Sequence, residues 1–272
     1  MVYYKLLLVN ILLGIILASV GAHPKFCNLD LIKSIKIGFI SGVCGFVFYL
    51  FFQFLTSNPL LLLCFSISGT ILAGFFIVLW VFFRDPERIS PEEPDVIVSP
   101  ADGKIVYIRE IEKGVVPSVI KGKKCIELKE IAKINLPDDT DGYIIGICMS
   151  ILDVHVTRSP LEGTIVFLKS FVGDVFSPKS WKSEVYNPRT TLAINNDTIQ
   201  LIIVEIGTPY VSKILSFFKV GDIVKKGQRI GKITWGSQVD IIIPTKCVDI
   251  LIEEGDLVCS GETLIANLNF KR

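Results

Sequence analysis

Three side chains in the C-terminal two thirds of this 272-residue sequence have the types that together activate a hydroxyl group. Ser237 offers the hydroxyl, His155 a base that can take its proton, and Asp102 a carboxylate that can orient the base. Gly236 precedes the serine in "GKITWGSQVD". Residue type and order do not bring three side chains together, so nucleophilic chemistry at Ser237 is a hypothesis at this point.

Each of the three residues also has an ordinary structural explanation. Most Gly-Ser pairs lie in loops, and a single histidine between apolar neighbours, as in "ILDVHVTRSP", is more often structural than catalytic. Asp102 in "SPADG" would ordinarily form an Asx turn beside Gly103. The two histidines and the seven cysteines are scattered without a CxxC pair, so the sequence predicts neither a metal site nor a disulfide framework.

The part of the chain that carries these residues has the pattern of short β-strands. From residue 96 onward, runs rich in Val and Ile alternate with Gly, Pro, Asp or Asn about every 8–12 residues, as in all-β folds. No long amphipathic helical period occurs between residues 96 and 268. The sequence therefore predicts an all-β or β-dominated sandwich or barrel domain over residues 96–272.

Two pairs of segments within this domain resemble each other. "KVGDIVKKGQRI" (219–230) aligns with "EEGDLVCSGETL" (253–264), and "SPADGKIV" (99–106) aligns with "SPLEGTIV" (159–166). The G-D-x-V-x-x-G pattern of the first pair is similar to the hairpins of lipoyl- and biotinyl-type sandwich domains. Its glycines are explained by turns that need a positive φ, so the repeats indicate scaffold rather than chemistry.

The N-terminal segment 1–83 has the composition of a membrane anchor. Residues 37–83 contain no Asp, Glu, Lys or Arg, which is long enough for two crossings of roughly 20 residues each. "TSNP" (56–59) divides this run into a hairpin of two spans, about 37–55 and 60–83. An apolar run at 6–22 is either a third span or a signal peptide. The proline-containing segment 84–95 is expected to be an extended linker.

Charges next to the spans predict the orientation of the anchor. Lys25, Lys33 and Lys36 precede the hairpin and Arg84 and Arg88 follow it, so both basic clusters lie on one side of the membrane. The positive-inside tendency makes that side cytoplasmic and predicts a multi-pass protein of the cell membrane with a cytoplasmic catalytic domain. The net charge of +1 gives no indication of nucleic acid binding.

Five segments occur in a distinctive order along the chain. They are "FFRDPER" (82–88), "VSPADGKI" (98–105), "MSILDVHVTRSPLEGTI" (149–165), "YNPR" (186–189) and "GQRIGKITWGSQVDIIIP" (227–244). In this order they resemble the phosphatidylserine decarboxylase family, most closely its short membrane-anchored members in bacteria and archaea, archaetidylserine decarboxylases included. The resemblance covers about residues 82 to 268, and a hydrophobic hairpin ahead of it is usual in that family.

The resemblance implies a self-processing enzyme. Ser237 would attack the carbonyl of Gly236, and elimination would release a large chain, 1–236, from a small chain, 237–272. Ser237 would become a pyruvoyl group, which would form a Schiff base with the amine of a serine phospholipid. Loss of CO2 would then yield the ethanolamine phospholipid, so the partners implied are a membrane phospholipid and the two processed chains.

The resemblance also suggests roles for individual residues. His155 corresponds to the family's histidine and is our choice for the general base in cleavage, with Asp102 as the carboxylate that orients it. Some members carry H-x-x-H here, and the second position of this pattern is Arg158, a candidate for binding the substrate carboxylate or phosphate, or simply a surface charge. Asn187 and Arg189 match the family's N-E-R segment and are further candidates for substrate binding, although Pro188 replaces the acidic residue.

Other readings stay open at this stage. A membrane-tethered adaptor with a lipoyl-like sandwich would explain the glycine repeats equally well, but not the Asp, His and Gly-Ser segments. A serine hydrolase is less consistent with the sequence, because the serine lacks a G-x-S-x-G elbow. The residues do not distinguish diacyl from archaeal diether lipids, and they carry no signal for or against a homodimer.

Overall fold

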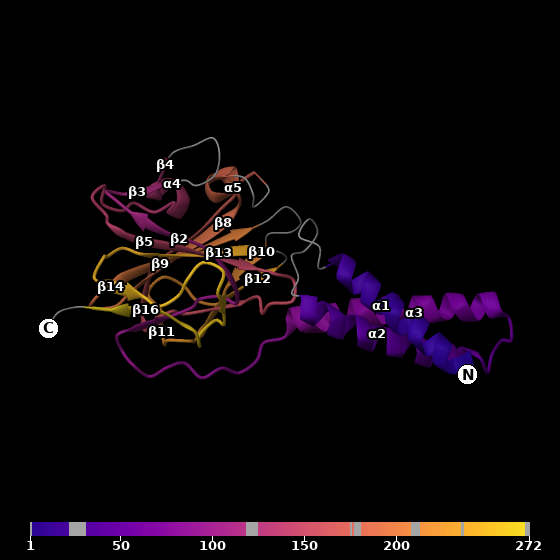
Figure 1. Ribbon diagram of the computed structural model, residues 1–272. Coiled ribbons are helices and arrows are strands. Elements are labelled where there is room, and N and C mark those ends of the chain that lie inside the picture. The colour runs from indigo at the N-terminus through magenta and orange to yellow at the C-terminus, as the bar shows by residue number, and fades with distance from the viewer. Residues whose placement is uncertain are drawn as a thin grey trace. The chain divides into compact units, whose positions relative to one another are not determined.

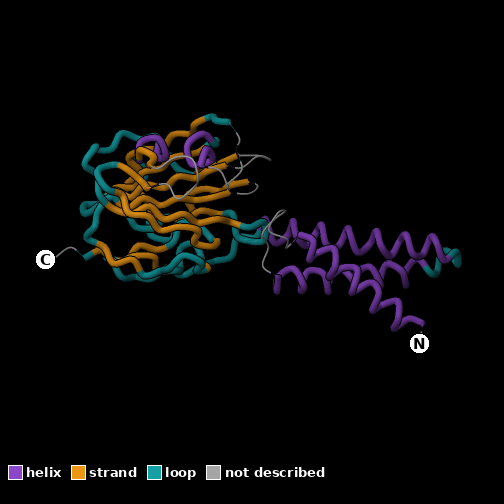
Figure 2. The backbone as a smooth tube through the Cα atoms, turned by 45° about the horizontal axis from the view of Figure 1, so that its top comes forward, coloured by secondary structure: helices purple, strands orange, loops and turns teal. Residues whose placement is uncertain are grey.

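We describe the protein from a computed structural model. The structure describes residues 2–21, 31–117, 125–174, 176, 181–207, 213–234 and 237–269. The chain divides into two compact units, a helical unit of residues 1–84 with 150–153 and a β unit of residues 85–149 with 154–272 (Figures 1 and 2). Each unit is described by itself.

The helical unit contains three helices, α1 (Val2–Gly21), α2 (Leu31–Phe52) and α3 (Pro59–Phe83). The helices α2 and α3 are long and apolar enough to cross a membrane, whereas the apolar part of α1, Tyr3–Ala18, is shorter. The predicted turn is found before α3, where the Asn58 side chain caps the helix by accepting a hydrogen bond from the Leu60 N–H at 3.0 Å. The helix α2 begins at Leu31 rather than at about 37. Its first turns therefore include Lys33 and Lys36, which lie before the uncharged run.

Small residues let the three helices approach closely. A Cβ atom added at Gly38 would lie 2.6 Å from the Gly14 carbonyl oxygen, and one added at Gly42 would lie 2.5 Å from the Asn10 carbonyl oxygen. Buried polar side chains add hydrogen bonds between α1 and α3. The Asn10 side-chain oxygen accepts a hydrogen bond from the Ser66 hydroxyl at 2.6 Å. Packing of this kind stabilises helix association in an apolar environment.

The β unit is built on one curled, eight-stranded antiparallel sheet with the strand order β11-β7-β8-β9-β13-β5-β2-β15 (Figure 2). Two three-stranded sheets, β1-β16-β14 and β10-β12-β6, and the hairpin β3-β4 complete it. The prediction of a β-dominated domain is therefore confirmed. The strands are β1 (Val96–Val98), β2 (Gly103–Ile111), β3 (Val115–Pro117), β4 (Cys125–Glu127), β5 (Gly142–Met149), β6 (Val156–Arg158), β7 (Gly163–Phe171), β8 (Arg189–Asn195), β9 (Gln200–Gly207), β10 (Lys213–Ser216), β11 (Ile223–Val224), β12 (Arg229–Thr234), β13 (Ser237–Ile243), β14 (Val248–Ile250), β15 (Leu257–Val258) and β16 (Leu264–Leu268).

The large sheet is buried on both faces. One face packs its isoleucines and valines, such as Ile147, Ile203 and Val239, against residues of the two small sheets. The other face packs against the hairpin β3-β4 and two short helices, α4 (Leu128–Ala132) and α5 (Trp181–Tyr186). Burial on both faces explains why the central strands are continuous apolar runs rather than alternating ones.

The β unit is an internal duplication. The first half-unit consists of β1, β2, β5 and β13 to β16, and the second half-unit consists of β6 to β12. Equivalent strands occupy mirrored places in the order of the large sheet, from β15 and β11 at its edges to β13 and β9 at its centre. The pairing agrees in detail, since β15 pairs with Gly103 and Lys104 of β2, and β11 pairs with Gly163 and Thr164 of β7.

This duplication explains the two sequence repeats. The segments that begin with Ser-Pro lead into β2 and β7, which are interrupted by equivalent bulges, and the G-D-x-V-x-x-G segments form the turns around β11 and β15. The glycines of these turns have positive φ, such as 97° at Gly221 and 104° at Gly255, as predicted. The likeness to lipoyl hairpins stays a prediction. The second half-unit is continuous in sequence and is inserted into the first between β5 and β13.

Candidate active site at the start of strand β13

Ser237 is the first residue of the central strand β13. Its backbone lies between two partners, Met149 at the end of β5 and Gly207 at the end of β9. Gly236 lies outside the described residues, as does Trp235 before it, and β12 ends at Thr234. The sheet therefore fixes the backbone of Ser237 on both sides, while the preceding segment joins it to the second half-unit.

His155 directly precedes β6 and is completely buried. Its backbone carbonyl accepts a hydrogen bond from the Ile233 N–H at 2.9 Å. Ile233 belongs to the end of β12, the strand that leads into the segment before Ser237. The fold thus brings the backbone of His155 next to the chain that enters the Gly236–Ser237 bond.

Asp102 lies between β1 and β2, and its carboxylate is held from several directions. The Arg88 guanidinium donates to both oxygens, and the Ser260 N–H donates to Oδ1 at 2.8 Å. The Val154 N–H, next to His155 in the chain, approaches Oδ2 at 3.4 Å. Burial opposes the charge of Arg88, but the hydrogen bond and charge of Asp102 outweigh it and raise the pKa of Arg88. The Asp102 carboxylate is therefore fixed in position beside the backbone of the residue that precedes His155.

The structure adds a residue that the sequence analysis missed, Glu205 of β9. It is 5% exposed, pairs with Val239 of β13, and lies two residues before Gly207. Its Oε1 accepts a hydrogen bond from the Thr157 hydroxyl at 2.7 Å. Burial raises the pKa of Glu205 to about 7, against the opposing effect of the Thr157 hydrogen bond. The sequence signal was an acidic residue inside the apolar run "LIIVEIG".

The three candidate substrate residues occupy two places. The Arg158 guanidinium contacts the Asp85 carboxylate at 3.1 Å and the carbonyls of Pro86 and Gly227. Asn187 donates to the carbonyl of Gly207 at 2.9 Å, which links it to the partner of Ser237. The fold thus brings Asn187, with the adjoining Arg189, toward the start of β13, whereas Arg158 joins residues 85–86 to the domain.

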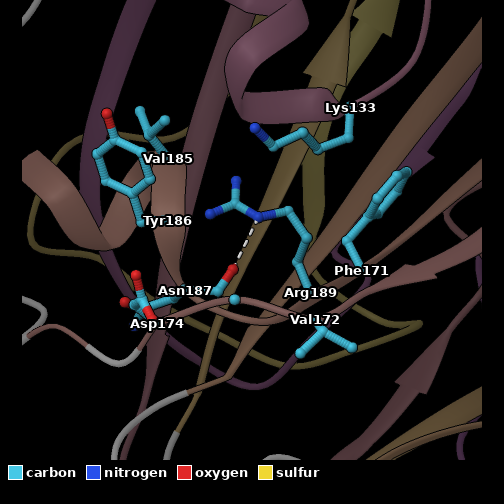
Figure 3. A pocket seen from close by; sticks show the side chains of 9 residues that line it. Lys133, Phe171, Val172, Asp174, Val185, Tyr186, Asn187 and Arg189 are labelled. Atoms are coloured by element: carbon cyan, nitrogen blue, oxygen red, sulfur yellow. Dashed lines mark hydrogen bonds between the residues drawn. The ribbon is translucent and has the colours of Figure 1, made fainter.

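Arg189 lies against a pocket of about 430 Å³ (Figure 3). Arg189 is 1% exposed, and its guanidinium group donates to three backbone carbonyls, including that of Ile131 at 2.7 Å. Lys133, which follows α4, reaches into the same pocket. Burial and the nearby charge of Arg189 lower the pKa of Lys133. Two cations whose charges repel each other favour an anionic ligand between them. Lys133 has no distinguishing sequence signal.

Among the residues that the structure describes, no three His, Cys, Asp or Glu side chains gather as a metal site. The site that can be described therefore has three parts. They are the Ser237 backbone with Glu205 on the neighbouring strand, the segment of His155 and Asp102 beside the end of β12, and a cationic pocket linked to Gly207 through Asn187. These groups can supply a nucleophile, a base, a buried acid and an anion-binding surface.

Comparison with known proteins agrees with a site that contains these groups. The family model for phosphatidylserine decarboxylase matches residues 75–266. The chain is 34% identical, over 74% of its length and 84% of the relative's, to the phosphatidylserine decarboxylase proenzyme of Carboxydothermus hydrogenoformans. It is 35% identical, over 68% of its length and 87% of the relative's, to the putative archaetidylserine decarboxylase proenzyme of Methanocaldococcus jannaschii. The matched region spans the whole β unit as far as β16, and so we conclude that this chain belongs to the phosphatidylserine decarboxylase family.

Proposed function

We propose that this protein is a self-cleaving decarboxylase that converts a serine phospholipid into the corresponding ethanolamine phospholipid. Membership of the family supports the reaction class, and both phosphatidylserine and archaetidylserine proenzymes occur among its relatives. The observation that carries the proposal is the position of Ser237, at the head of a strand paired on both sides and four residues after Ile233, whose N–H bonds to the His155 carbonyl.

Cleavage uses groups of the chain itself. The Ser237 oxygen attacks the carbonyl carbon of Gly236 while His155 accepts the hydroxyl proton, and the bond from that carbon to the Ser237 nitrogen breaks as the nitrogen is protonated. Asp102 supports His155 through the backbone at Val154, since its carboxylate is held in place by Arg88 and Ser260. Elimination of the Gly236 carboxylate from residue 237 then separates chain 1–236 from chain 237–272.

The residues around position 237 fit a pyruvoyl group formed from the serine. The flanking strands hold the backbone of residue 237 from both sides, and Gly207 brings no side chain against it. The group would supply a ketone, an electron-withdrawing carbonyl that ordinary side chains lack. The pocket of Lys133 and Arg189 binds the anionic part of the lipid headgroup, with Asn187 joining the pocket wall to Gly207.

The apolar helices α2 and α3 anchor the protein in the membrane that contains its substrate. We assign a multi-pass topology with a cytoplasmic β unit, because basic residues flank the hairpin on one side. We further assign α1 to the mature anchor rather than to a removed signal peptide. Its buried Asn10 bonds to Ser66 of α3, and removal of α1 would leave that hydroxyl without this partner.

The proposal is tested by expressing the full chain, Ser237→Ala and a control, Ser216→Ala, in a bacterial membrane. Ser216 is an exposed serine of β10. Denaturing mass spectrometry is expected to find two fragments divided between 236 and 237 in the wild type and in Ser216→Ala. Ser237→Ala is expected to remain one chain. Release of CO2 from phosphatidylserine vesicles is expected only from the cleaved proteins.

The same experiment separates the proposal from a non-enzymatic adaptor. A wild-type chain that folds but stays continuous through residues 236 and 237 would support the adaptor and contradict the decarboxylase. The mass of the large fragment also reports on α1, since retention of this helix predicts a large fragment that still contains Val2–Gly21.

A further inference from the structure

One pair of equivalent buried positions is polar in the second half-unit and apolar in the first. In the second half-unit, Thr157 of β6 and Glu205 of β9 form a buried hydrogen bond. The equivalent positions in the first half-unit are Ile97 of β1 and Ile243 of β13. The equivalence follows from the register, because Glu205 pairs with the second residue of β8 and Ile243 pairs with the second residue of β5.

An apolar pair is the expected occupant of such a position. Ile97 and Ile243 are both fully buried in the core of the β unit. A carboxyl group in the same setting loses its hydration, and the Thr157 hydroxyl that bonds to it compensates for only part of that loss. Since one copy of the scaffold is complete with two isoleucines, the polar pair in the other copy calls for a functional explanation.

The hydrogen bond between Thr157 and Glu205 connects β6, which follows His155, to β9, which pairs with the strand of Ser237. Glu205 lies two residues before Gly207 on β9, and Gly207 is the partner of Ser237. Residues diagonal across two antiparallel strands are roughly 7–8 Å apart, within reach of a long side chain. Thr157 follows His155 by two residues in the chain that enters β6. The Thr157–Glu205 hydrogen bond therefore ties the His155 segment to the strand beside Ser237.

We propose that Glu205 is a positioning residue for self-cleavage, which in its neutral form holds Thr157, and with it the His155 segment, against β9. This inference rests on the proposed function. The neutral form matters because the Gly236 carbonyl oxygen becomes negative as the Ser237 oxygen attacks. An ionised Glu205 two residues along the neighbouring strand would oppose that developing charge. Cleavage should therefore slow as Glu205 loses its proton.

Other charged groups near Glu205 are directed elsewhere. Asp240 of β13 bonds to Gln238 and lies on the opposite face of the sheet, as does Arg189 of β8, which bonds to the Ile131 carbonyl. On the side of β6 and β12, Arg158 contacts Asp85, and Arg229 contacts Asp85 and Glu87. A Cβ atom added at Gly231 of β12 would lie 3.3 Å from Glu205 Oε1, so this position faces Glu205. Lys232 is the next residue of the strand and therefore faces the other side. His155 is the titratable side chain of the neighbouring segment.

The test measures the rate of self-cleavage of freshly synthesised full-length chain, in detergent, between pH 5 and 10. The wild-type rate is expected to fall above neutral pH as Glu205 loses its proton, approaching about tenfold per pH unit. Glu205→Gln keeps a neutral acceptor for Thr157, so it is expected to cleave within about threefold of wild type at pH 6 and to lack the alkaline fall.

Two further variants make the test independent of how well Glu205→Gln folds. Thr157→Val removes the hydrogen bond that favours the ionised carboxylate, so the alkaline fall is expected at higher pH than in wild type. The double variant Thr157→Ile with Glu205→Ile copies the apolar pair of the first half-unit. It is expected to fold, to cleave more slowly than wild type at pH 6, and to show no alkaline fall.

The outcomes distinguish this inference from the proposed function. A wild-type chain that never cleaves contradicts the proposed function itself. A wild type that cleaves without an alkaline fall contradicts only the role of Glu205. The role of Glu205 is also contradicted if the alkaline fall persists unchanged in Glu205→Gln, or if it stays at its wild-type pH in Thr157→Val. A folded Glu205→Gln variant that does not cleave at any pH would contradict it as well.

Discussion

Asp102 is surrounded by donors because a buried carboxylate must be compensated. Its partner Arg88 is itself nearly buried, with 7% of its side chain exposed. Arg88→Ala would leave the Asp102 charge buried and unpaired, so we expect the free energy of unfolding to fall by about 3–5 kcal/mol. Arg229→Ala removes a more exposed ion pair to Asp85 and should cost less than about 1 kcal/mol. Denaturant titration in detergent measures both; equal losses would contradict the compensating role of Arg88.

Substitutions of Lys133 and Lys129 provide a test variant and a matched control for the role of the cationic pocket. Lys133 lines the pocket with Arg189, whereas Lys129 of the same α4 segment is exposed and pairs with Glu127. Lys133→Met should raise the KM for phosphatidylserine about tenfold and leave self-cleavage unchanged, because one charge contact to the headgroup is lost. Lys129→Met should leave both unchanged. Steady-state CO2 release gives the KM, and an unaltered KM in Lys133→Met would place the headgroup elsewhere.

Glu205 also predicts how stability depends on pH. Its pKa is raised from 4.5 in the unfolded chain to about 7 in the folded one, so the folded state keeps the proton longer. The stabilisation is complete below about pH 4.5 and is lost as pH rises through 7, by on the order of 3 kcal/mol. Glu205→Gln should remove this loss. Unfolding free energies at pH 5 and 9 test it, and parallel curves for wild type and variant would contradict the assignment.

At the residue scale, the sequence identified candidate site residues that stand in a motif. It did not identify residues that are distinguished only by their burial in the fold. Ser237, His155 and Asp102 stand in recognisable segments. In the fold, the His155 carbonyl accepts a hydrogen bond from Ile233, and the Asp102 carboxylate lies beside the Val154 N–H. Glu205 and Lys133 depend on tertiary contacts made across long stretches of chain. A glutamate in an apolar strand and a lysine after a short helix have no local pattern that reveals those contacts.

At the scale of elements, the junction between β1 and β2 is the most constrained turn near the site. Gly103 has φ +149°, and an added Cβ would lie 2.4 Å from the Cys148 carbonyl oxygen. Gly103→Ala should therefore destabilise the protein by about 2–4 kcal/mol and displace Asp102, which slows cleavage. Gly221 has φ +97° and open space around it, so Gly221→Ala should add only backbone strain of about 1 kcal/mol. Thermal unfolding compares them, and a Gly103→Ala protein as stable as Gly221→Ala would contradict this.

The elements themselves were largely predictable. Val- and Ile-rich runs between turn residues became the strands of the large sheet, and "TSNP" became the turn before α3. The short helices α4 and α5 were not predicted, because segments of five and six residues contain too few turns to show a helical period. The repeats were visible in the sequence, but their meaning as two half-units needed the pairing of β15 with β2 and of β11 with β7.

At the scale of the whole molecule, the small chain should stay attached after cleavage. The segment 237–272 supplies β13, which pairs with both β5 and β9, and β15 and β16, which pair with β2 and β1. We expect chains 1–236 and 237–272 to migrate together in gel filtration in detergent and to separate only in denaturant. Dissociation of the two chains under native conditions would contradict this pairing.

The insertion of the second half-unit gives the molecule a second copy of the strand junction at which Ser237 lies. Where β5 would turn back into β13, the second half-unit has a closed hairpin, in which Asn195 of β8 pairs with Gln200 of β9. In the first half-unit, the equivalent pair is Cys148 with Gln238, and Met149 pairs with Ser237 one step further along. The whole second half-unit separates these partners in the chain. A cut there breaks no strand pairing. If the chain is cut between Gly236 and Ser237 as proposed, β13 gains a free end that the neighbouring strands still keep in register.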